Sequence, residues 1–150
     1  MAMPGQPLRL VLDTNVVASA LLWGGTPRLL LQAARDKRVQ LFTSTPLLAE
    51  LTDILGRPKF GKKIEASLLT VDQLVDYYAA LTTLVRPTPT PRIAPDPDDD
   101  VVIGTGLAAK ADFIVTGDKP LLSVECHQQT RIINVSIATQ KIKGDDDLAG

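Results

Sequence analysis

The segment LRLVLDTNVVASALL, residues 8–22, carries a single carboxylate, Asp13, in an otherwise almost wholly apolar stretch. An ionised carboxylate without a partner is costly in apolar surroundings unless its pKa changes. Asp13 can cap the helix expected after it, but a charge in this position also needs a compensating group close by. The residue types available elsewhere in the chain indicate what that group is.

Further acids lie where they could reach Asp13. Asp118 directly follows the apolar segment FIVTG, and Glu50 is the one acid among the leucines of PLLAEL. The run Asp98–Asp100 leads into a helix expected from residue 101. Four carboxylates that converge without a neutralising histidine or arginine raise one another's pKa. A hard cation with oxygen ligands, Mg²⁺ or Mn²⁺, would compensate them, so these residues predict a metal site that includes Asp13.

The elements that must position these acids alternate along the chain. Hydrophobic patterns predict strands over 8–12, 39–44, 112–118 and 130–135, and helices over 15–22, 27–38, 46–56, 64–84 (one or two helices) and 101–111. Strands that alternate with helices imply an α/β fold with a parallel sheet covered on both faces. Ligands bind such sheets beyond the carboxyl ends of the strands, and Asp13 and Asp118 each follow a strand.

Length and composition predict one soluble domain over residues 1–150, with a core over about 8–135 and a disordered tail over 143–150. The proline-rich segment 86–100 is not a linker, because the chain beyond it is too short for a second core. A net charge of −1 gives no global basic field, and a single cysteine excludes an internal disulfide. With no signal segment or long apolar run, we expect a cytoplasmic protein without membrane association.

The motifs VLDTNVVASALL, DPDDD and ADFIVTGDKPLL, together with Glu50, resemble the PIN-domain nucleases over about residues 8–135. The closest branch is that of the toxins of toxin–antitoxin pairs, similar to VapC. The resemblance implies a three-layer α/β/α sandwich with a mainly parallel sheet, and a Mg²⁺- or Mn²⁺-dependent ribonuclease that cuts single-stranded RNA. It also implies an antitoxin protein as a partner and admits a homo-oligomer.

Carried over by position, the family's acids fall on four residues that would act as catalytic and metal-binding groups: Asp13, Glu50, Asp100 and Asp118. Asp100 is preferred over its neighbours because the family's third acid directly opens a helix. Supporting positions fall on Thr14, Asn15, Asp98, Asp99 and Thr116. Two glycines depart from the family pattern, because Gly104 and Gly106 stand where helix formers are usual and weaken the helix expected there.

A basic segment lies between the third and fourth expected helices, with Arg57, Lys59, Lys62 and Lys63 as candidate phosphate contacts for RNA. A solvated turn is an equally good interpretation, and Trp23 and Phe60 are too isolated in the sequence to indicate a stacking surface.

Two other functions stay open. A non-catalytic PIN-like binding module would keep the acids for structure alone. A phosphoaspartyl phosphatase would also begin with an aspartate after a strand, but it would need an acid where Asn15 stands.

Overall fold

The computed structural model describes residues 6–94 and 96–149, with side chains described as far as residue 144. Its strands are β1 (Leu8–Leu12), β2 (Val39–Thr43), β3 (Thr82–Leu84), β4 (Phe113–Val115), β5 (Cys126–His127) and β6 (Thr130–Ile133). Its helices are α1 (Thr14–Leu22), α2 (Thr26–Arg35), α3 (Thr45–Leu55), the 3₁₀ turn η1 (Pro58–Phe60), α4 (Gly61–Ser67), α5 (Val71–Leu81), α6 (Pro97–Ala108), α7 (Lys119–Leu122) and α8 (Val135–Ala149).

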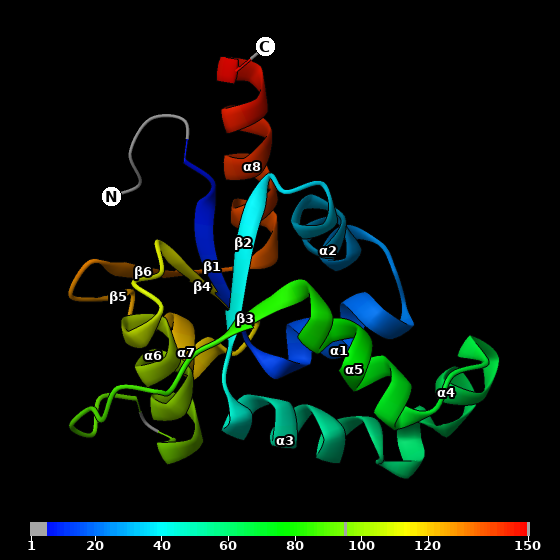
Figure 1. Cartoon of the computed structure of the whole chain (residues 1–150). Helices are drawn as coiled ribbons and strands as arrows, with labels where there is room; N and C mark the ends of the chain where they lie inside the picture. The colour runs from blue at the N-terminus through cyan, green and yellow to red at the C-terminus, as the bar shows by residue number, and fades with distance from the viewer. Residues whose placement is uncertain (1–5, 95, 150) are drawn as a thin grey trace.

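The described strands form one sheet in the order β3-β2-β1-β4-β6-β5, in which β5 alone runs antiparallel to its neighbour (Figure 1). β1 is central and buried, and it pairs in parallel with β2 on one side and with β4 on the other. The register places Leu12 opposite Val115, so the residues that follow both strands meet at the same sheet edge. The expected α/β fold with a mainly parallel sheet is therefore confirmed.

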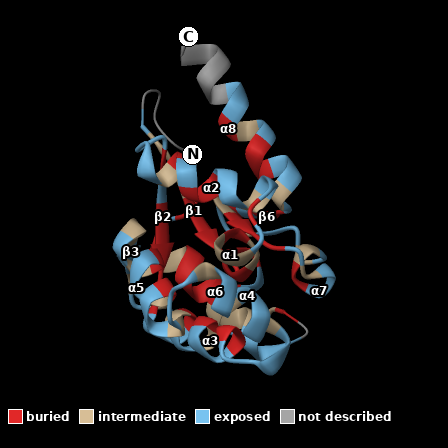
Figure 2. Ribbon diagram, turned by 90° about the vertical axis from the view of Figure 1, so that its right-hand side faces the viewer, coloured by how far each residue is buried: buried red, intermediate tan, exposed pale blue. Residues whose placement is uncertain are grey.

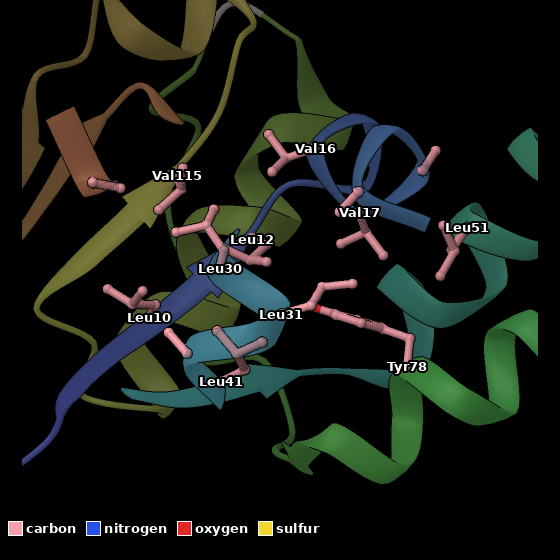
Figure 3. Packing of buried hydrophobic residues seen from close by; sticks show 14 of the residues in the cluster. Leu10, Leu12, Val16, Val17, Leu30, Leu31, Leu41, Leu51, Tyr78 and Val115 are labelled. Carbon is pink, nitrogen blue, oxygen red and sulfur yellow. The ribbon is translucent and has the colours of Figure 1, made fainter. Parts of the chain in front are cut away.

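Two apolar clusters cover the two faces of the sheet. Because side chains alternate along β1, Leu10 and Leu12 face one cluster and Val11 faces the other. The larger cluster joins β1 and β2 to α1, α2, α3, α5 and α8, and Figure 3 shows Leu31 and Tyr78 within it. The smaller cluster lies under α6 and α7. Helices thus form the outer layers of a three-layer α/β/α sandwich, and the buried residues gather in its centre (Figure 2).

Several elements differ from the expectations. The helical pattern was extended to residue 84, but α5 ends at Leu81 and the chain continues as the short edge strand β3. The strand β5 was not expected, because two residues carry no periodicity. A disordered tail was predicted over 143–150, but the structure continues α8 to Ala149, and residue 150 lies outside the described residues.

Gly104 and Gly106 have a packing role that the sequence did not reveal. A Cβ atom on Gly104 would lie 2.5 Å from the backbone oxygen of Thr88, and one on Gly106 would lie 2.8 Å from Cδ1 of Ile114. The proline-rich segment runs along α6, where the Thr88 N–H donates to the oxygen of Gly104 over 3.0 Å. The glycines therefore let α6 approach both this segment and the sheet, at the expense of helix propensity.

None of the helices in the described part of the chain combines the length and the apolar character that crossing a membrane requires.

Candidate active site

Asp13 lies at the carboxyl end of β1 and caps α1. Its backbone N–H continues the pairing with β4 by donating to the Val115 oxygen over 2.9 Å, and its side chain is 5% exposed. Oδ1 accepts the N–H of Thr14 at 2.8 Å, and Oδ2 accepts the hydroxyl of Thr116 at 2.7 Å. Burial raises the pKa of Asp13, while these hydrogen bonds act in the opposite direction. Capping alone thus leaves a charge that the protein stabilises only in part.

Asp118 is tied to Asp13 through Thr116. The hydroxyl of Thr116 donates to Asp13 and accepts the N–H of Asp118 at 3.0 Å. The side chain of Asp118 caps α7 by accepting the N–H of Leu121 at 3.2 Å, and its charge raises the pKa of Asp13. The strand-end positions of the two acids therefore bring their charges together, as the parallel sheet predicts.

Glu50 reaches the same region from α3. Its pKa is raised mainly by burial, and further by the charges of Asp13 and Asp98, while Arg57 lowers it. The Thr14 hydroxyl stabilises the charged form of Glu50, yet its oxygen is buried and has no hydrogen-bond partner of good geometry. The Thr14 hydroxyl is thus a further buried polar group at the site without a hydrogen-bond partner.

Asp99 is the member of the aspartate run that meets the other acids. Burial raises its pKa to about 7, followed by a hydrogen bond to Asp118 and by the charges of Asp118 and Asp13. At neutral pH the Asp99 carboxyl is therefore partly protonated, because burial and the neighbouring acids both disfavour its charged form. Four acids from four parts of the chain, β1, α3, α6 and the end of β4, act on one another.

Asp100, preferred from the family pattern, makes different contacts. Its Oδ1 accepts the N–H of Ala94 at 2.7 Å and that of Ile93 at 3.1 Å, and its Oδ2 lies 3.7 Å from Nε of Arg92. Asp100 therefore fastens the proline-rich segment to the first turn of α6.

The remaining supporting positions divide between the site and its surroundings. Asp98 is exposed but acts on Glu50 through its charge, whereas Asn15 is exposed on α1. Thr14 and Thr116 are both buried beside Asp13.

The PIN-domain family model matches residues 9–120, which include all four interacting acids. The chain belongs to the PIN-domain family. PIN domains are generally metal-dependent nucleases, so this chain has a nuclease-type fold. A search of curated proteins found no match.

The acids of this PIN domain have the chemistry of a site for a hard cation. In the described part of the chain, the ion pairs Arg57–Asp53 and Arg92–Asp100 leave Asp13, Glu50, Asp99 and Asp118 without a salt-bridge partner. The candidate metal-binding atoms are all oxygens. Burial and neighbouring acids raise the pKa of Asp13, Glu50 and Asp99, so the charged forms of these carboxyls lack compensation. Among the described residues, no group of three or more acid, histidine or cysteine side chains is already arranged to hold a metal ion.

The basic segment of the PIN domain adjoins the acids. Lys59 lies in η1, Lys62 and Lys63 lie in α4, and Arg57 precedes η1 and acts on Glu50 through its charge. All four side chains are exposed. The segment also brings Phe60 against Trp23, a contact that could not be predicted because the two residues are far apart in the chain.

Proposed function

We propose that this PIN domain is a Mg²⁺- or Mn²⁺-dependent endoribonuclease that hydrolyses phosphodiester bonds of single-stranded RNA. The observation that carries the proposal is the grouping of Asp13, Glu50, Asp99 and Asp118 at one edge of the sheet, where burial, and after it the charges of neighbouring acids, raises the pKa of the first three. Asp13 and Asp118 accept hydrogen bonds, but the four acids lie close to one another with no salt-bridge partner among the described residues. Such an arrangement is typical of sites in which the compensating charge is a bound cation.

The proposed ligand set is Asp13, Glu50, Asp99 and Asp118. A divalent cation held by these oxygens would supply positive charge beside the phosphoryl group and lower the pKa of the attacking water. Thr116 orients Asp13 and the backbone of Asp118, and the cap to Leu121 fixes the side chain of Asp118. The proton that Asp99 carries in the metal-free protein would leave when a cation binds.

Other residues of the chain do not offer a metal-free route of the kind that pairs of histidines provide. The sequence contains one histidine, His127, which lies on β5 at the far edge of the sheet from β3. A pair of histidines that exchange acid and base roles is therefore excluded. The acids and the substrate phosphate repel each other, so a cation between them is also needed to hold that phosphate at the acids.

The test is cleavage of a fluorescent single-stranded RNA by wild type and Asp13→Asn, each with Mg²⁺, with Mn²⁺ and with EDTA. We expect cleavage by wild type with either metal, none with EDTA, and a loss of several orders of magnitude in the variant. Thermal melts of both proteins establish that the variant is folded. Full activity of wild type in EDTA, or of Asp13→Asn with metal, would overturn the proposal. Inactivity of a folded wild type with both metals would favour a non-catalytic binding module.

A role as the toxin of a toxin–antitoxin pair extends the proposal and rests on the motif resemblance. Induced expression of wild type should then arrest growth, whereas Asp13→Asn should not. Equal growth with both proteins would contradict the toxin role and leave the nuclease chemistry to the cleavage assay.

A further inference from the structure

Trp23 and Phe60 form an aromatic pair on the surface, at the opposite end of α1 from Asp13. Trp23 ends α1 and Phe60 ends η1, and their ring centroids lie 5.4 Å apart at 76° in an edge-to-face arrangement. Phe60 packs against the larger apolar cluster, which anchors the pair from below. Trp23 is 50% exposed, although burying it would gain a large apolar area. An anchored pair with one open ring is suited to receive another planar group.

Positive charge surrounds the pair. The Lys63 ammonium lies 5.4 Å from the Trp23 ring centroid, and the Lys59 ammonium lies 5.0 Å from that of Phe60. We call these four residues, Trp23, Phe60, Lys59 and Lys63, the Trp23 platform. The ion pairs Arg57–Asp53, at 3.6 Å, and Arg92–Asp100 of the described residues include neither Lys59 nor Lys63. The platform thus combines an exposed aromatic ring with the ammonium groups of two lysines.

The platform lies at the opposite end of α1 from Asp13. α1 begins at the Asp13 cap and ends at Trp23, and its nine residues span about 14 Å. That distance equals about four nucleotides at the roughly 3.4 Å spacing of a stacked strand. Arg57 connects the two regions, since it precedes η1 and its charge acts on Glu50. A strand with a phosphate at the acids could therefore reach the platform along α1.

We propose that the Trp23 platform binds a single-stranded nucleic acid, with an unpaired base stacked on Trp23 and flanking phosphates contacted by Lys59 and Lys63. The inference deepens the proposed function and rests on it for the position of the scissile bond. Base stacking on aromatic side chains combined with lysine contacts to phosphate is the general physics of single-strand binding. The Lys63 side chain is flexible, so its ammonium can move from the ring to a phosphate when a base arrives.

The exposed ring and the two lysines favour a single-stranded nucleic acid over a duplex or a second copy of the chain. A base in a duplex has both faces covered by its neighbours, so the platform selects single strands. A second copy of this chain, which has a net charge of −1, offers no general attraction to lysines, whereas every nucleotide carries a phosphate.

The experiment uses the emission of Trp23, the one tryptophan in the chain. Wild type in EDTA, where the proposed chemistry is absent, is titrated with a short oligouridine and with an RNA duplex at several salt concentrations. We expect the single strand to quench the emission and the duplex to leave it unchanged. Quenching should weaken with salt because phosphate contacts release counterions. No quenching when fluorescence anisotropy shows the labelled oligouridine bound would overturn the platform, as would equal quenching by duplex.

Variants assign the contacts. Trp23→Ala should weaken oligouridine binding about ten-fold by anisotropy, and Trp23→Phe should recover part of the loss because a ring is restored. Tyr77→Ala, which removes another exposed aromatic side chain, should bind like wild type. Lys59→Gln/Lys63→Gln should reduce the slope of affinity against salt by about two phosphate contacts. Lys37→Gln/Lys110→Gln removes the same charge before β2 and β4, at the opposite sheet edge, and should keep the slope.

The outcomes separate this inference from the proposed function. If Trp23→Ala binds oligouridine like wild type while metal-dependent cleavage persists, the platform is refuted and the nuclease stands. If no metal supports cleavage but Trp23 is quenched as expected, the platform stands without the chemistry. A change in emission with protein concentration alone, before any RNA is added, would assign the surface to a second copy of the chain and overturn the inference.

Discussion

The Thr116 hydroxyl donates to Oδ2 of Asp13 over 2.7 Å and so joins the ends of β4 and β1 at the candidate active site. Because the same hydroxyl accepts the N–H of Asp118, one uncharged side chain fixes two of the four acids. The hydrogen bond stabilises the ionised form of Asp13, which burial disfavours.

Thr116→Val tests this link, because valine keeps the shape and removes the donor. We expect the free energy of unfolding to fall by about 2 kcal/mol at pH 8, the range for a hydrogen bond to a buried charged group. Denaturant titrations measure it, with Thr139→Val as the control. Thr139 is also buried but bonds locally to the Ser136 oxygen within α8. Equal losses in the two variants would mean that the bond to Asp13 has no special weight.

The raised pKa of Asp99 predicts how stability depends on pH without metal. A carboxyl whose folded pKa is about 7, against about 4 unfolded, binds more protons in the folded state between these values. The free energy of unfolding in EDTA should therefore fall as pH rises from about 4 to about 7. Asp99→Asn should flatten this decline, whereas Asp76→Asn, at an exposed position of α5, should not. Superimposable pH profiles of wild type and Asp99→Asn would contradict the raised pKa of Asp99.

Asp100→Asn should act on the fold rather than on the chemistry. The change removes the charge that accepts the N–H groups of Ile93 and Ala94, so the proline-rich segment should loosen from α6. We expect a loss of about 1–2 kcal/mol and faster hydrogen exchange at the buried Ala94 amide. Asp98→Asn, in the same turn but exposed, should leave that exchange unchanged. An Ala94 amide exchanging at the wild-type rate in Asp100→Asn would refute the structural role.

Gly104→Ala should destabilise the protein although alanine favours helix. Its Cβ would meet the Thr88 oxygen, a backbone atom that cannot move aside alone, and overpacking of this kind costs about 1–3 kcal/mol. Gly144→Ala is the matched control in α8, where a Cβ meets nothing within 4 Å, and it should stabilise by up to about 1 kcal/mol. Thermal melts of both variants give the comparison. A higher melting temperature for Gly104→Ala than for wild type would show that α6 does not pack as described.

The positions of Asp13 and Asp118 at the carboxyl ends of their strands could be predicted, because a residue that directly follows a strand can be recognised from the local sequence. Asp13 and Asp118 each follow a buried strand, and parallel strands place such residues together whatever the helices do. The threonines beside them, Thr14 and Thr116, were named from the resemblance to the family. The short strands β3 and β5 could not be predicted, because their pairing comes from the neighbouring strands rather than from their own patterns.

The choice within the aspartate run could not be made from sequence. A helix expected from residue 101 leaves all three aspartates before it, whereas α6 begins at Pro97 and places them in its first turn. Successive helix residues point about 100° apart, so Asp99 and Asp100 face different neighbours. The starting point of one helix thus decides which acid meets Asp118. The contact of Trp23 with Phe60 was likewise hidden, because it depends on how α1 and η1 pack together.

Calorimetric titration with Mn²⁺ of wild type, Asp99→Asn and Asp100→Asn shows whether Asp13, Glu50, Asp99 and Asp118 hold a divalent cation. Wild type and Asp100→Asn should bind Mn²⁺ with similar affinity, while Asp99→Asn should bind about ten-fold more weakly or worse. Wild type should also release protons on binding, seen as a heat that varies with the buffer. Equal affinity of Asp99→Asn and wild type, or no binding by wild type, would mean that these four acids do not form the cation site.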